Sequence, residues 1–131
     1  MEKVSDGASV FAPAANYSTV RWAVTDAVAR GDDWDTADLE SSFVNAMLDS
    51  SNNIFVTLPA VWGGGRAKLL RALYGLKSSP RAWFNCLRAF LVGQGYEQHE
   101  REPCLWQKFT DGPNGERVRI RLVVYVDDFV I

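Results

Sequence analysis

The segment Tyr125–Ile131 places two adjacent aspartates, Asp127 and Asp128, between two runs of apolar, mostly β-branched residues. Aspartate is a poor strand former, so the pair interrupts the strand and favours a hairpin that carries both carboxylates at its tip. Adjacent carboxylates repel each other unless a cation neutralises them. A tight turn with paired aspartates therefore predicts a site for a divalent metal with oxygen ligands, usually Mg²⁺. The dipeptide by itself is equally compatible with a solvated turn.

The composition is that of a globular chain. Its 131 residues are enough for one domain, and 47% of them are hydrophobic, including five Trp, seven Phe and four Tyr that can fill a core. No apolar run is long enough to span a bilayer, and Met1–Asp6 has no signal-peptide pattern. We therefore expect an intracellular, soluble chain with a single domain over residues 1–131 and an irregular N-terminal segment over residues 1–10.

Cysteine spacing and net charge restrict the partners that the sequence predicts. Cys86 and Cys104 are the only cysteines, and together with His99 they match no common zinc motif, so we expect free, partly buried thiols. The net charge of −2 and the pI near 5.3 argue weakly against a self-sufficient nucleic-acid binder. Clustering of the basic residues partly offsets this. The clusters are Arg66, Lys68, Arg71, Lys77, Arg81 and Arg88, and Arg117, Arg119 and Arg121.

Periodicity predicts two principal helices. Helix 19–30 has apolar residues at helical spacing, Ser18 or Thr19 as its cap, and Gly31 after its last turn. Helix 80–92 follows Ser79 as a cap, with Pro80 in its first turn.

Short strands are predicted between and after these helices, and they define an α+β fold. The C-terminal strand pair flanks an Asp-Gly-Pro-Asn-Gly loop, and three glycines form the connection that follows an earlier strand. We expect an antiparallel sheet with helices packed on one face. The predicted pieces are a turn and short strand over 32–39, one or two helical turns over 41–48, a strand over 54–58, the connection 63–65, and strands over 103–109 and 117–126.

A metal site at the aspartate pair needs a third carboxylate. Two divalent ions about 3.5–4 Å apart require several bridging carboxylates. Asp38 ends a short predicted strand and can point at the turn of a neighbouring strand. The nearby acids leave the choice of Asp38 open on spacing alone. These acids are Asp32, Asp33, Asp35 and Glu40.

Several segments resemble, in the same order, those of the reverse transcriptase of copia-type LTR retrotransposons. The most specific is Leu70–Phe84, which reads Leu-Arg-Ala-Leu-Tyr-Gly-Leu-Lys-Ser-Ser-Pro-Arg-Ala-Trp-Phe. The resemblance covers roughly residues 8–131 and implies a partial polymerase palm and fingers fold. The other matching segments are Phe11–Ala14 with Ser18–Arg21, Ala37–Ala46, Ile54–Pro59, and the Tyr-Val-Asp-Asp signature Tyr125–Asp128.

This resemblance implies roles for the three aspartates. Asp38, Asp127 and Asp128 match the metal-binding catalytic residues, which hold two Mg²⁺ ions, with Mn²⁺ as the alternative ion. The family reaction is RNA-directed DNA synthesis. A primer 3′-hydroxyl attacks the α-phosphate of a deoxynucleoside triphosphate, and diphosphate leaves. The implied partners are an RNA or DNA template with its primer and the deoxynucleoside triphosphates.

The resemblance also implies a nucleotide and template pocket. Phe43 matches the position whose ring lies beneath the incoming sugar, where a bulky ring clashes with a 2′-hydroxyl. The remaining pocket residues implied by the family pattern are Tyr74, Gly75 and Lys77.

Departures from the family pattern leave alternatives open. The basic residues that hold the triphosphate, the thumb and the ribonuclease H domain have no counterpart in the sequence, and only Phe129–Ile131 follows the signature aspartates. We therefore expect a truncated reverse-transcriptase domain that is inactive by itself, and its status as an enzyme stays open. One alternative is a catalytically inactive retroelement remnant that binds nucleic acid or protein. Another is a different palm-fold nucleotidyltransferase.

Overall fold

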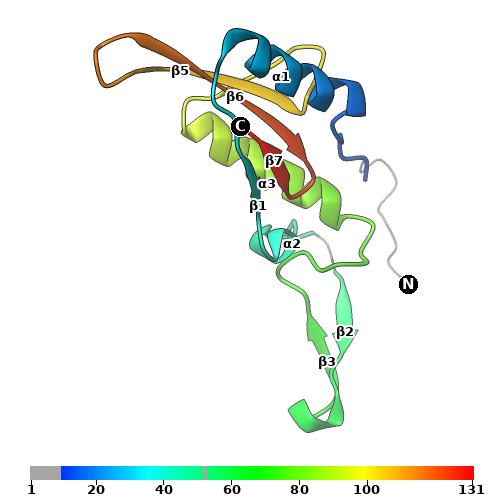
Figure 1. Ribbon diagram of the computed structural model, residues 1–131. Coiled ribbons are helices and arrows are strands. Elements are labelled where there is room, and N and C mark those ends of the chain that lie inside the picture. The colour runs from blue at the N-terminus through cyan, green and yellow to red at the C-terminus, as the bar shows by residue number, and fades with distance from the viewer. Residues whose placement is uncertain (1–9, 52) are drawn as a thin grey trace. The chain divides into compact units, whose positions relative to one another are not determined.

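The computed structural model describes residues 10–51 and 53–131, so the expected irregular segment over 1–10 lies, apart from Val10, outside the described residues (Figure 1). The chain divides into two compact units, which we describe separately. One unit contains Ser41–Cys86 together with the segment that ends at Ala12. The other contains Pro13–Glu40 and Leu87–Ile131.

An antiparallel sheet of five strands forms the second unit, which confirms the predicted α+β class and antiparallel sheet. The strand order is β1-β7-β6-β5-β4, so β7 lies between β1 and β6. The predicted strand over 117–126 is found as β6, whereas the strand predicted over 103–109 starts two residues later. The strands are β1 (Thr36–Asp38), β4 (Glu97–Gln98), β5 (Leu105–Asp111), β6 (Arg117–Tyr125) and β7 (Asp128–Val130).

Helix α1 (Tyr17–Arg30) confirms the first predicted helix but begins earlier than expected. Asn16 caps it, because its side-chain oxygen accepts the Ser18 backbone N–H at 3.2 Å. The predicted cap at Ser18 or Thr19 is therefore wrong, and the Thr19 hydroxyl instead donates to Glu102 at 2.9 Å. Gly31 ends the helix with φ 72°, as predicted, since only glycine adopts this conformation without strain.

Both faces of the sheet are covered. On one face, Val123 of β6 packs with Ala23 of α1 and with the buried Cys104. Side chains alternate along a strand, so Leu122 and Val124, which are also buried, point to the opposite face. Both faces of the sheet therefore carry buried side chains at the end of β6. The continuous apolar run at the end of β6 is the pattern of a strand that is buried on both sides.

Two apolar residues of α3 (Ser79–Gly93) belong to this unit and are buried, namely Leu87 and Leu91. The helix itself confirms the prediction over 80–92 (Figure 1). No helix within the described residues is long and apolar enough to cross a membrane.

The other unit contains a two-stranded hairpin. Strands β2 (Phe55–Thr57) and β3 (Arg66–Lys68) pair in antiparallel register, and the short 3-10 helix η1 (Ala60–Trp62) and Gly63–Gly65 connect them. This confirms the predicted strand and its glycine connection. The predicted helical turn is found as α2 (Ser42–Asn45).

Ser79 has a different role from the helix cap that its sequence position predicts. Its side chain is fully buried, donates to the Leu73 carbonyl at 2.6 Å and accepts the Leu73 backbone N–H at 3.0 Å. The Ser79 hydroxyl therefore joins the loop at Leu73 to the first residue of α3. A buried hydroxyl needs both kinds of partner, and one backbone residue supplies them here.

Candidate active site

The pairing of β1 with β7 places Asp38 directly opposite Asp128. Asp35 and Ile131 exchange backbone hydrogen bonds at 3.1 and 3.0 Å, and the Leu39 N–H donates to the Asp127 carbonyl at 3.0 Å. Hydrogen-bonded and non-hydrogen-bonded pairs alternate along an antiparallel ladder, so Asp38 and Asp128 form a non-hydrogen-bonded pair. In such a pair the Cα atoms are about 4.5 Å apart and both side chains leave the same face of the sheet.

The sequence predicts both aspartates at the tip of a hairpin; Asp127 lies in the tight turn between β6 and β7, whereas Asp128 is the first residue of β7. The turn contains two residues, Val126 and Asp127, and Val126 adopts φ 60°. A β-branched residue is strained at positive φ. Among the described residues, Ser41 is the other non-glycine residue with positive φ, at 56°. Both strained positions lie within three residues of a candidate aspartate, and backbone strain of this kind concentrates at functional sites.

The three aspartates are accessible and lack cationic partners. Asp38 and Asp128 are exposed, and Asp127 is half-buried. Within residues 10–51 and 53–131, no arginine, lysine or histidine forms an ion pair with them. Two carboxylates at facing positions repel each other, so this end of the sheet favours a bound cation.

The chemistry of the donors fits Mg²⁺, because carboxylate oxygens are the hard ligands that this ion takes. The side chains are not gathered around one point. In the described part of the chain, no three acidic, histidine or cysteine side chains converge closely enough to form a metal cage. The backbone therefore brings the three aspartates to one end of the sheet, and their carboxylates do not form a closed ligand set.

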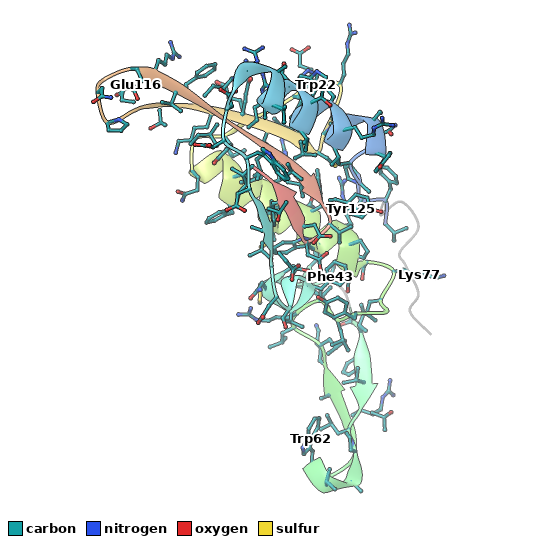
Figure 2. The ribbon with its side chains drawn as sticks, viewed as in Figure 1. Trp22, Phe43, Trp62, Lys77, Glu116 and Tyr125 are labelled. Atoms are coloured by element: carbon teal, nitrogen blue, oxygen red, sulfur yellow. The ribbon has the colours of Figure 1, made fainter. Side chains whose placement is uncertain are left out.

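Phe43 and Tyr74, in the other unit, are in direct contact. Their ring centroids are 4.6 Å apart and the ring planes are tilted by 38° (Figure 2 labels Phe43). Two backbone hydrogen bonds hold their segments together: the Ala72 N–H donates to Ala46 at 2.9 Å, and the Leu48 N–H donates to the carbonyl of residue 70 at 3.0 Å. The pairing explains how residues 31 positions apart in the sequence meet.

Gly75 and Lys77 lie in the loop that connects this paired segment to α3. Gly75 adopts φ 92°, and Lys77 is exposed and projects from the loop (Figure 2). The structure thus divides the predicted site residues by unit. The aspartates lie in one unit, and Phe43, Tyr74, Gly75 and Lys77 lie in the other.

Among the acids that the sequence leaves open, Asp38 is the one that faces Asp128 in the strand register. Asp35 faces Ile131, and Asp32 and Asp33 precede β1. Tyr125 is a candidate residue that sequence reasoning missed. It faces Asp128 across the β6–β7 hairpin and is 51% exposed, although an apolar run normally buries its aromatic residue. Its position next to the two-residue turn is the signal that could have identified it.

Comparison with known proteins identifies the family. Residues 3–131 match the model of the reverse transcriptase (RNA-dependent DNA polymerase) family. The match covers nearly the whole chain, so the chain belongs to this family. The resemblance to the copia-type enzymes is confirmed by the relatives described next.

These relatives are transposon polyproteins of plants. The chain is 27% identical to the Retrovirus-related Pol polyprotein from transposon TNT 1-94 of Nicotiana tabacum, over 99% of the chain and 10% of that protein. It is 28% identical to the Retrovirus-related Pol polyprotein from transposon RE1 of Arabidopsis thaliana, over 96% of the chain and 8% of that protein. The chain therefore spans about a tenth of the length of these curated relatives. No solved structure matches the chain.

Proposed function

We propose that this chain is a palm and fingers part of an RNA-directed DNA polymerase and carries its metal-binding aspartates. The observation that supports this proposal most strongly is that Asp38 faces Asp128, with Asp127 in the adjoining turn, in a chain that belongs to the reverse transcriptase family. Three carboxylates at one end of an antiparallel sheet suit a two-metal phosphoryl transfer. The partners are a template with its primer and deoxynucleoside triphosphates.

Asp38, Asp127 and Asp128 hold the metal ions in this proposal. Divalent ions bound there would supply positive charge that stabilises the attacking 3′-hydroxyl oxygen and the leaving diphosphate. The chain itself provides position and charge. The ladder between β1 and β7 fixes the spacing of Asp38 and Asp128. The strained turn at Val126 sets the direction of the backbone at Asp127. No side-chain nucleophile takes part, because the substrate hydroxyl attacks the phosphate.

Phe43 discriminates between sugars in the same proposal. Its ring is half-buried and rests against Tyr74, so it has limited freedom to move away from an incoming nucleotide. A rigid ring excludes a 2′-hydroxyl better than a mobile one. Gly75 leaves room for a nucleotide or template to approach the backbone, and the exposed ammonium group of Lys77 offers charge to phosphates.

Metal binding by the purified chain tests the proposal. Mn²⁺ bound to the chain is measured by electron paramagnetic resonance, with Mg²⁺ as competitor. We expect Asp38→Asn, Asp127→Asn and Asp128→Asn each to weaken binding at least tenfold. Asp33→Asn removes a carboxylate from the same unit outside the ladder and should leave the affinity within a factor of two. Equal binding by Asp127→Asn and the unmodified chain would overturn the proposal.

Primer extension on an RNA template examines the reaction itself. The assay compares the unmodified chain with Asp127→Asn in the presence of Mg²⁺. Any extension that survives Asp127→Asn contradicts the assigned mechanism. Metal binding without extension is the result expected if synthesis needs further parts of a longer polyprotein. Absence of metal binding favours the catalytically inactive remnant.

A further inference from the structure

A group of exposed aromatic rings with arginines over them lies on α1 and the β5–β6 hairpin. The Arg21 guanidinium lies 5.8 Å from the Tyr17 ring centroid, and that of Arg117 lies 4.6 Å from Phe109. A third pair joins the two elements, because Arg121 of β6 lies 5.0 Å from the ring of Trp22 on α1 (Figure 2 labels Trp22). Three cation–π contacts therefore lie on two neighbouring elements of one unit.

The rings are exposed although aromatic side chains normally gain most by burial. Tyr17 is 75% exposed, and Trp22 and Phe109 are each 46% exposed. None of them contributes to the buried core of the sheet. Exposed apolar surface that gathers in one place marks a binding site more often than scattered residues do.

The arginines of this surface carry charge that the chain leaves uncompensated. Arg121 is the exception, because its guanidinium pairs with Asp26, which also accepts from Arg30 at 2.9 Å. Arg21, Arg117 and Arg119 form no ion pair with any described residue. Arg117 and Arg119 leave the same face of β6, and Phe109 faces Arg119 across the hairpin. This face of the hairpin therefore presents the Phe109 ring beside Arg117 and Arg119, with Asp111 opposite Arg117.

Acidic residues lie beside this surface in two places. Asp111 and Glu116 lie at the hairpin tip, where the Glu116 carboxylate accepts the Asn114 backbone N–H at 3.0 Å. A cavity of about 760 Å³ between α1, β6 and β7 is lined by Asp32, Asp33 and Asp35, and also by Arg119 and Arg121. A duplex presents two phosphate strands and no free base faces. A single strand presents one row of phosphates and unstacked bases, which match the unpaired arginines and the exposed rings of this surface.

We propose that this basic–aromatic surface binds single-stranded nucleic acid, with bases stacked on its rings and phosphates on its unpaired arginines. The surface consists of Tyr17, Arg21, Trp22, Phe109, Arg117 and Arg119. Stacking platforms interleaved with cations bind single strands with little sequence preference. The inference rests on the proposed function only for the class of partner, since binding here needs neither a metal ion nor the three aspartates.

Fluorescence anisotropy of labelled 20-residue oligomers, dT and rU, tests the surface in EDTA at several salt concentrations. Each neutralised phosphate contributes about −0.7 to the slope of log affinity against log salt for single strands. Arg119→Gln should therefore weaken binding and flatten the slope by about 0.7. Phe109→Leu should weaken binding by roughly five- to a hundredfold, as the loss of one stacked base predicts, without changing the slope.

Lys108→Gln is the matched control, because it removes one charge from the opposite face of the same hairpin, where Lys108 lies over Tyr96. The slope of log affinity against log salt for Lys108→Gln should stay within about 0.2 of the slope for the unmodified chain. This margin is about a third of the change expected when one phosphate contact is lost. Equal losses in Lys108→Gln and Arg119→Gln would overturn the proposal, and so would unchanged binding in Arg119→Gln and Phe109→Leu.

Binding that disappears in EDTA or in Asp127→Asn would assign the nucleic acid to the aspartate site instead. Because Arg119 is exposed and makes no ion pair, Arg119→Gln should leave the fold intact, and its change in binding measures the lost charge. A preference for rU over dT, or the reverse, identifies which single strand the surface takes.

Discussion

Asp38 and Asp128 face each other across the β1–β7 ladder, with the Leu39 N–H bound to the Asp127 carbonyl at 3.0 Å. This register keeps the two carboxylates on the same face of the sheet. A slip by one residue would move Asp38 to the opposite face of the sheet and leave Asp128 beside an apolar side chain. The ladder thus holds two like charges together at a cost that a bound cation relieves.

Asp38→Asn should stabilise the chain in the absence of divalent metal. It removes one charge from the facing pair and keeps the side-chain shape, so we expect the free energy of unfolding to rise by up to about 1 kcal/mol. Adding Mg²⁺ should stabilise the unmodified chain and leave Asp38→Asn almost unchanged. Urea denaturation with and without 10 mM Mg²⁺ measures both effects. Asp33→Asn should show neither effect, and a metal-free loss of stability in Asp38→Asn would contradict the repulsion.

Local patterns predicted much of this fold because each depends on neighbouring residues. The apolar spacing of α1 and α3, Gly31 at φ 72° and the aspartate hairpin all follow from backbone preferences that act within a few positions. The pairing of Asp38 with Asp128 joins residues 90 positions apart, so spacing alone could not select it over the neighbouring acids.

The helix caps show why other local predictions failed. Thr19 and Ser79 both have the residue type and position of a cap, but each hydroxyl has a better partner. Glu102 is brought to Thr19 by the fold of the chain, and the Leu73 backbone folds back onto Ser79. A capping bond stabilises by about 1 kcal/mol, so a tertiary hydrogen bond of similar strength displaces it readily.

Val126→Gly should stabilise the hairpin at the aspartate turn. Val126 has φ 60°, where a β-branched side chain is strained by roughly 1–3 kcal/mol and glycine is not. Val126→Ala is the matched control, since alanine loses the same methyl groups and keeps the Cβ atom. We expect Val126→Gly to exceed Val126→Ala in free energy of unfolding by about 1 kcal/mol. If alanine equals or exceeds glycine in urea denaturation, the turn does not keep its positive φ in solution.

Cys104 should make the stability of the chain fall at alkaline pH. Burial, and then the nearby Glu102 carboxylate, raise the pKa of its thiol from 9.0 to about 11. Below pH 9 the thiol is protonated in both states. From pH 9 to about 11 the unfolded state ionises while the folded state keeps its proton, so the free energy of unfolding falls across this window. Cys104→Ala should show a shallower fall than Cys86→Ala, which retains the buried thiol.

Alkylation checks the burial of Cys104 independently. Both cysteines are free, as predicted, and Cys86 is half-buried whereas Cys104 is fully buried. Iodoacetamide at pH 8 should modify Cys86 in the folded chain and Cys104 only after unfolding in urea. Peptide mass analysis separates the two sites. Rapid modification of Cys104 in the folded chain would show that the buried cluster that contains Cys104 and Val123 opens readily.

The contact between Phe43 and Tyr74 should be measurable as a coupling energy. Tilted aromatic pairs at this separation contribute about 0.5–1.5 kcal/mol beyond the area that they bury. A double-mutant cycle with Phe43→Leu and Tyr74→Leu, read from urea denaturation, should give a coupling in this range. Tyr74→Phe keeps the ring and should keep Phe43 coupled to position 74. Coupling near zero would mean that the rings move independently, and Phe43 would then lack the support that its proposed role beneath the sugar requires.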